Sequence, residues 1–138
     1  MKKIKIGIDI TSLSSSFYGG SDTYCNGLIK GFSKGYKNCE FQIYLNKEYF
    51  KKRKKNFFKK KNFKFIVIDI SIYKKILLKI YNRIFPNIIF LIGYKKYFID
   101  YILRNFIYSE FKYTVENNSD ILISPNVLLK SYDLKIPT

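Results

Sequence analysis

The sequence has no histidine, tryptophan or alanine, and only two cysteines, three prolines and ten acidic residues among its 138 positions. Without histidine the chain has no imidazole to serve as a base or a metal ligand, and no Ser-His-Asp triad can form within it. Cys25 and Cys39 form neither a CxxC motif nor a metal-ligand cluster. We therefore expect two reduced thiols, no disulfide and no metal site.

Long hydrophobic runs are also missing. The opening segment Ile4–Ile10 is interrupted by a lysine and an aspartate, and no small-residue cleavage site follows it, so it does not resemble a signal peptide. The most apolar stretch, Ile76–Ile92, contains two basic residues and a proline, which makes it a poor transmembrane span. These features predict a cytoplasmic chain.

Basic residues, by contrast, are abundant: 26 Lys+Arg against 10 Asp+Glu give a formal net charge of +16. Such a charge favours a polyanion or an anionic membrane surface as a partner. The excess is mostly lysine and accompanies heavy use of Ile, Phe, Tyr and Asn, whose codons are rich in A and T. Biased genome composition therefore explains the charge equally well.

The densest basic run, Lys51–Lys61, is interleaved with Phe57 and Phe58. This mixture occurs in proteins that bind single-stranded nucleic acid and on membrane-facing surfaces. It is also typical of a solvated loop between a helix and a strand, which is the simplest interpretation. No helix-turn-helix, zinc-finger or RNP1-like pattern is present, so specific nucleic-acid recognition is not predicted.

Apolar residues recur with the period of a strand in four segments and with the period of a helix between them. Strands are expected over residues 4–10, 40–45, 63–70 and 120–124. Helices are expected over 23–34, 47–55, 73–85 and about 88–114, with Pro86 separating the last two. This alternation predicts an α/β fold: a Rossmann-like parallel sheet with flanking helices, in one domain spanning residues 1–138.

Two of these helices contain apolar stripes. The stripe expected to face the sheet from the first helix consists of Tyr24, Leu28, Ile29 and Phe32. Gly27 and Gly31 each cost about 1 kcal/mol relative to alanine, and close packing against a strand would compensate. The stripe in the last predicted helix consists of Ile99, Ile102, Leu103 and Phe106. It is predicted to pack in the core, and the basic residues along its edges would also suit contact with a membrane interface.

The junction between the first strand and the first helix is a candidate anion site. Asp9 ends the strand, and after a serine-rich segment Gly19 and Gly20 let backbone N–H groups approach a ligand. Ser21 or Asp22 can cap the helix, whose N-terminus favours a phosphate. The full Gly-x-Gly-x-x-Gly spacing is absent, so a plain strand–helix turn is an equal alternative.

A second group of polar residues, Ser124 and Asn126, follows the fourth strand on either side of Pro125. They would lie at the carboxyl edge of a parallel sheet, where open α/β folds bind their ligands.

Four motifs in this order resemble the amino-terminal domain of a GT-B fold glycosyltransferase of the retaining, family-4 type. Ile6-Gly-Ile-Asp-Ile10 is similar to that family's opening strand. Gly19-Gly-Ser-Asp-Thr-Tyr24, followed by Gly27-Leu-Ile, resembles its diglycine loop and first helix. Asp120-Ile-Leu-Ile-Ser-Pro-Asn126 resembles a later strand, and Lys135-Ile-Pro-Thr138 the approach to the next one. The resemblance spans the whole chain.

The resemblance implies transfer of a sugar from a nucleotide-sugar donor to the hydroxyl of a glycan or glycolipid acceptor, with no further cofactor. The amino-terminal domain would bind acceptor, and a carboxy-terminal domain would hold most of the donor. Gly19 and Gly20 would lie near the donor diphosphate, in a site that also includes Ser21 and Asp9. Ser124 and Asn126 would line the cleft edge. The setting would be synthesis of a surface polysaccharide or glycolipid, peripherally at the inner face of the membrane.

Departures from the family pattern limit this assignment. Asp22 replaces the second loop glycine. The family's Thr-x-His-Asp motif would come only after Pro137-Thr138, so no catalytic residue is assigned. The donor domain is absent as well, and we expect an amino-terminal fragment that is inactive alone. The alternatives are a basic module for membranes or nucleic acid, and another Rossmann-like nucleotide-binding domain; a missing third glycine and the lack of an acid closing the second strand disfavour the latter.

Overall fold

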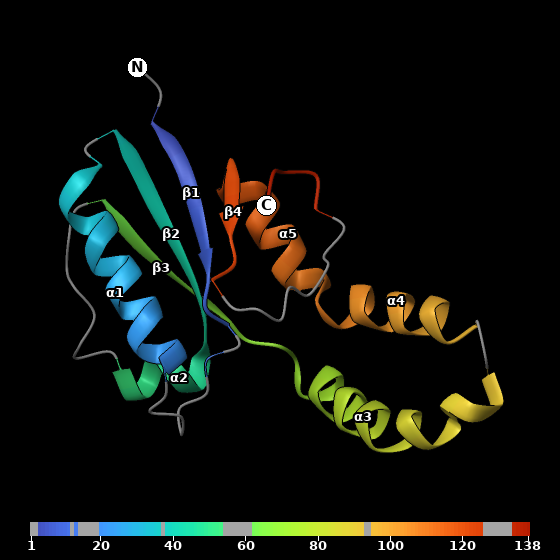
Figure 1. The fold of residues 1–138 in the computed structure, drawn as a ribbon. Helices are drawn as coiled ribbons and strands as arrows, with labels where there is room; N and C mark the ends of the chain where they lie inside the picture. Colours follow the sequence, from blue (N-terminus) through green and yellow to red (C-terminus); the bar gives the residue numbers. More distant parts are fainter. Residues whose placement is uncertain are drawn as a thin grey trace. The chain divides into compact units, whose positions relative to one another are not determined.

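A computed structural model describes residues 3–11, 13, 20–36, 38–53, 62–92, 95–125 and 134–138. For some residues within the helices it describes the backbone and not the side chain. The chain forms two compact units. The sheet unit comprises Met1–Asp69 and Thr114–Thr138, and the helical unit comprises Ile70–Tyr113. Figure 1 shows the elements of both.

The sheet unit is built on four parallel strands in the order β3-β2-β1-β4 (Figure 1). This architecture confirms the predicted α/β fold with a Rossmann-like parallel sheet. The strands are β1 (Ile4–Asp9), β2 (Cys39–Asn46), β3 (Phe63–Ile68) and β4 (Ile121–Ile123). The apolar run of β3 is typical of a strand buried on both faces, but β3 is the edge strand, and Lys64 and Val67 on it are exposed.

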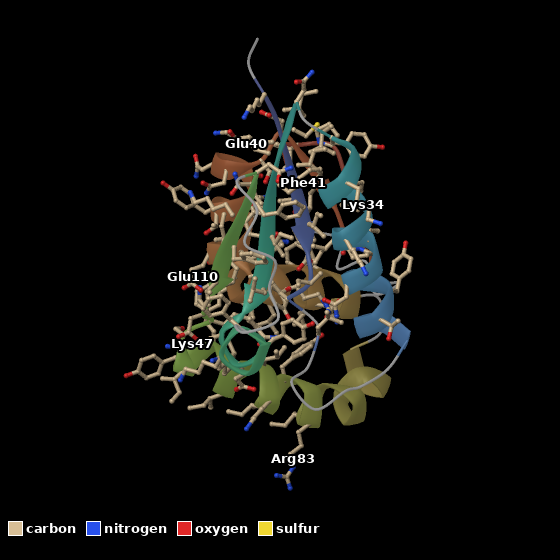
Figure 2. All side chains as sticks on the ribbon, turned by 90° about the vertical axis from the view of Figure 1, so that its left-hand side faces the viewer. Lys34, Glu40, Phe41, Lys47, Arg83 and Glu110 are labelled. Atoms are coloured by element: carbon tan, nitrogen blue, oxygen red, sulfur yellow. The ribbon has the colours of Figure 1, made fainter. Side chains whose placement is uncertain are left out.

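One face of the sheet packs against α1 (Gly20–Gly35), and α2 (Lys47–Arg53) follows β2 directly. Because side chains alternate along a strand, Ile8, Ile43 and every second residue beside them point to this face. Phe41 stacks between Phe32 of α1 and Phe63 of β3, with ring centroids 5.1 and 5.0 Å apart. Figure 2 labels Phe41 within this core.

The face of α1 that meets the sheet is rotated from the predicted one. Ile29 is buried and Leu28 and Phe32 pack against the core as expected, but Tyr24 is exposed and Cys25 takes its place. The small thiol fits against the strands, while the phenol keeps its hydroxyl in water.

The two helix glycines do not pack closely. A Cβ added at Gly27 or Gly31 would meet nothing within 4 Å, and both positions are exposed. They lie on the solvent side of α1, so the expected compensation by close packing is wrong.

The opposite face of the sheet contains a tight polar contact. Tyr44 is fully buried, and its hydroxyl shares a 2.7 Å hydrogen bond with Oγ of Ser119, which follows α5 (Ser109–Asn118). Burial raises the pKa of Tyr44, and the Ser119 hydrogen bond offsets part of that rise. Beside this pair, β1 has Gly7, where a Cβ would come within 2.7 Å of Ser119 Oγ and 3.0 Å of Leu122 Cδ1.

Hydrogen bonds on both sides hold the short strand β4. Asp120 accepts a 2.8 Å bond from the backbone N–H of Lys5 through its carboxylate, and its own N–H donates to the Lys5 carbonyl at 2.8 Å. On the outer side, the N–H of Leu122 donates to the carbonyl of Pro137 at 2.9 Å. The chain at Pro137 therefore lies beside the outer edge of β4.

The helical unit contains α3 (Ile72–Ile92), α4 (Lys95–Ile107) and the start of α5. Helices α3 and α4 run antiparallel (Figure 1). Tyr81 donates to the Asp100 carboxylate, which also accepts two hydrogen bonds from Arg104 Nε, at 2.7 and 2.8 Å. Burial and the neighbouring carboxylate raise the pKa of Tyr81. Lys74 forms a 2.8 Å ion pair with Glu110.

The positions of the helix breaks differ from the prediction. Pro86 was expected to end one helix, but α3 continues through it to Ile92, and the long helix expected next is divided near Tyr108. A proline inside a helix removes one backbone hydrogen bond, and the clash of its ring can be relieved by a bend.

The stripe predicted as core in α4 is only partly covered. Ile99 and Leu103 are half-buried, whereas Ile102 and Phe106 are exposed. Of the cysteines, Cys25 is a buried free thiol and Cys39 a half-buried one. Within the described ranges, no helix combines the length and apolar character needed to cross a bilayer.

Candidate functional site

The strand order fixes where a ligand site can form. From β1 the chain adds β2 and β3 on one side, then returns to place β4 on the other side of β1. The connections that follow β1 and β4 therefore leave from neighbouring strands at the carboxyl edge of the sheet. Open α/β sheets bind ligands at this topological switch point.

Asp9 lies at this edge and shapes the turn that leaves β1. It is the last residue of β1, it is buried, and its Oδ1 accepts hydrogen bonds from the Thr11 backbone N–H at 2.9 Å and the Thr11 hydroxyl at 2.7 Å. An aspartate that accepts the N–H two residues later forms an Asx-turn. Leu13 continues the turn by donating its N–H to the Ile10 carbonyl at 3.1 Å. The chain thus turns directly after β1, and Leu13 is buried in the core.

Asn46 holds the same segment from the neighbouring strand. Its Nδ2 donates to the carbonyls of Thr11 at 2.9 Å and Leu13 at 2.7 Å. Its Oδ1 accepts a 2.7 Å bond from the backbone N–H of Tyr49, in the first turn of α2. One amide therefore caps α2 and anchors the connection after β1.

Helix α1 begins at Gly20, so its first N–H groups lie at the end of this connection. Gly20 is exposed, and a Cβ added there would meet nothing within 4 Å. Ser21 and Asp22 fall inside the first turn of α1 instead of preceding it, although either was expected to cap the helix. The side chains of Ser21 and Asp22, and all of Gly19, lie outside the described residues.

Ser124, the residue that follows β4, lies at the same edge of the sheet. Ile8 of β1 pairs with Ile123 of β4, so Asp9 and Ser124 occupy the next positions of the two neighbouring strands. Ser124 is half-buried. The register therefore brings these two predicted site residues to the same edge. Asn126 lies outside the described residues.

The chemistry available at this edge is that of binding. It offers backbone N–H groups at the start of α1, the Thr11 and Ser124 hydroxyls, and a carboxylate already bonded to Thr11. The N-terminus of a helix favours an anion by its partial positive charge and its unpaired N–H groups. In the part of the chain that the structure describes, no three His, Cys, Asp or Glu side chains gather as metal ligands.

Comparison with known proteins identifies no relative. No family model matches the sequence, and neither the curated proteins nor the solved structures give a match. The fold is thus established from the structure alone.

Two residues that organise this edge were not predicted as part of the site. Thr11 pairs with Asp9 in an Asp-x-Thr pattern that is typical of an Asx-turn. Asn46 was taken only as the end of a strand, yet an asparagine before a helical segment is also a common N-cap. Its second function, anchoring a connection more than thirty residues earlier, depends on the parallel pairing of β1 with β2 and has no local sequence signal.

Proposed function

We propose that this chain is the acceptor-side half of a GT-B type sugar transferase, and that its β1–α1 connection contacts the diphosphate of a nucleotide-sugar donor. One observation supports this most: the Asp9–Thr11 turn and α1 follow β1, Ser124 follows β4, and these two neighbouring strands flank the switch point of the sheet. Open α/β sheets use that point for nucleotides. The motif resemblance narrows the ligand to a nucleotide sugar.

In this proposal the residues of the edge have separate functions. The backbone N–H groups of Gly19 and Gly20 hydrogen-bond the diphosphate and stabilise charge that develops on the leaving nucleotide. Asp9 is a positioning residue. Its carboxylate would repel a diphosphate in direct contact, whereas its hydrogen bonds to Thr11 orient the connection after β1. Ser124 and Asn126 face the acceptor side of the cleft. The donor sugar itself is held by a second α/β domain.

Binding of nucleoside diphosphates to the 138-residue chain tests this proposal by calorimetry. We expect weak binding of UDP, GDP or ADP, weakened roughly five- to tenfold by Gly20→Glu, since a second negative charge within about 4 Å costs about 1 kcal/mol in water. Gly27→Glu is the matched control, because Gly27 is equally open but lies further along α1. Its binding should equal that of the wild type.

Two other results would contradict the proposal. Tighter binding of NADH than of any nucleoside diphosphate or nucleotide sugar would indicate a dinucleotide-binding domain instead. Sugar transfer by the isolated chain would show that no second domain is required.

A further inference from the structure

The helical unit exposes an unusual amount of apolar surface. On α3 the exposed fraction of five large apolar residues lies between 46% and 81%; they are Ile72, Tyr73, Ile76, Ile80 and Ile84. Four more are exposed on α4 at intervals of three and four residues: Phe98, Tyr101, Ile102 and Phe106. Residues at this spacing share a side of a helix. We call the two sets the α3 stripe and the α4 stripe.

Basic residues flank the α3 stripe. At roughly 100° per residue, the α3 stripe covers about 120° of the helix, and Lys75, Lys79 and Arg83 lie on one border of it. All three are exposed, and Figure 2 shows Arg83 extending away from α3. Leu77, Leu78 and Tyr81 lie on the remaining side, where Tyr81 bonds Asp100 of α4. Helix α3 contains no acidic residue.

We propose that the helical unit binds the surface of an anionic phospholipid bilayer. The α3 stripe enters the boundary between headgroups and acyl chains, and Lys75, Lys79 and Arg83 meet lipid phosphates. Helices with an apolar face bordered by Lys and Arg lie in the plane of a membrane in this way. This inference does not depend on the proposed sugar transfer.

Charge and chemistry together favour a bilayer over other occupants. A nucleic acid would satisfy the basic border but would leave the isoleucines in contact with phosphate and water. A second copy of this chain would bring the same border and another +16 of net charge to the interface, which opposes association. An anionic bilayer offers hydrocarbon and negative charge side by side.

Sedimentation of the 138-residue chain with vesicles tests the inference. We expect binding to vesicles of 70% phosphatidylcholine and 30% phosphatidylglycerol, and much weaker binding to pure phosphatidylcholine. The double variant Lys75→Gln/Lys79→Gln should weaken binding about thirtyfold, since each lysine near an anionic surface contributes about a factor of five. Lys34→Gln/Lys64→Gln removes the same charge from exposed positions of the sheet unit and should have a smaller effect.

The apolar contribution needs its own variant. Ile76→Asn/Ile80→Asn leaves the charge unchanged and should weaken vesicle binding at least tenfold. Because both side chains are about half exposed, the thermal unfolding of this variant should stay close to that of the wild type. Tyr24→Asn, at an exposed position of α1, is the matched control and should bind as the wild type does.

The absence of tryptophan allows a direct probe of insertion. Tyr73→Trp in the α3 stripe should show a blue-shifted emission when anionic vesicles are added, whereas Tyr24→Trp should not. Equal losses in the helical-unit and sheet-unit charge variants would overturn the inference. So would an unshifted Tyr73→Trp emission on bound protein, self-association through the α3 stripe, or tighter binding to single-stranded RNA than to vesicles.

Discussion

Gly7→Ala should destabilise the protein by about 1–3 kcal/mol. The new methyl group would lie 2.7 Å from Ser119 Oγ, 2.9 Å from Tyr44 Cε2 and 3.0 Å from Leu122 Cδ1. Overpacking of this kind costs about 1–3 kcal/mol, and disruption of the Tyr44–Ser119 hydrogen bond adds about 1 kcal/mol. Alanine restricts the unfolded chain and offsets up to about 1 kcal/mol of that cost.

The free energy of unfolding, measured by urea denaturation and circular dichroism, provides the assay. Gly27→Ala and Gly31→Ala are matched controls, because a Cβ at either position meets nothing within 4 Å. Each should stabilise α1 by about 1 kcal/mol, so the same substitution has opposite signs on β1 and α1. A neutral or stabilising Gly7→Ala would refute the close packing of β1 against Tyr44 and Ser119.

Two further predictions concern the polar contacts of the sheet unit. Asn46→Ala should destabilise the protein by about 1–3 kcal/mol in thermal unfolding, since it removes the α2 cap and the anchor of the β1 connection. Asn46→Asp keeps the oxygen that caps α2 but loses both hydrogen bonds donated to the carbonyls of Thr11 and Leu13. We therefore expect faster amide hydrogen exchange at Leu13 while α2 stays folded, which would separate the anchoring of the β1 connection from the capping of α2. Tyr44→Phe should cost about 1–3 kcal/mol at pH 7 because it leaves the buried Ser119 hydroxyl unpaired. The pKa of Tyr44 is raised in the folded state, so folding favours the neutral phenol. This contribution to the free energy of unfolding is complete below the ordinary tyrosine pKa of about 10. It is lost as pH rises through the raised pKa of Tyr44 in the folded protein. Tyr44→Phe should flatten this alkaline loss, and a loss as steep as in the wild type would show that ionisation of Tyr44 is not its cause.

The sheet was predictable because its signals are local. Alternating isoleucines identified β1, and short apolar runs between helical segments indicated a parallel sheet. The ends of helices were harder to predict at proline, which can either end a helix or be accommodated within one by a bend. Pro86 was expected to end a helix, yet α3 continues through it to Ile92.

Solvent exposure was the hardest property to predict from periodicity. A stripe of apolar residues has the same spacing whether it packs in a core or faces solvent, so Ile102 and Phe106 were misassigned. At the candidate site, Asp9 and Ser124 were predicted at the sheet edge, because a strand end is visible in the sequence. The anchoring by Asn46 depends on strand pairing and was not visible.

The most direct test of the proposed function is to map where a nucleoside diphosphate binds, by titrating UDP, GDP and ADP into the isotope-labelled chain and following the backbone amide signals. The proposed function predicts the largest shifts at Thr11, Gly20 and Ser124, around the switch point between β1 and β4. Shifts concentrated on Lys75, Lys79 and Arg83 of α3, or no shifts at millimolar nucleotide, would contradict the proposal.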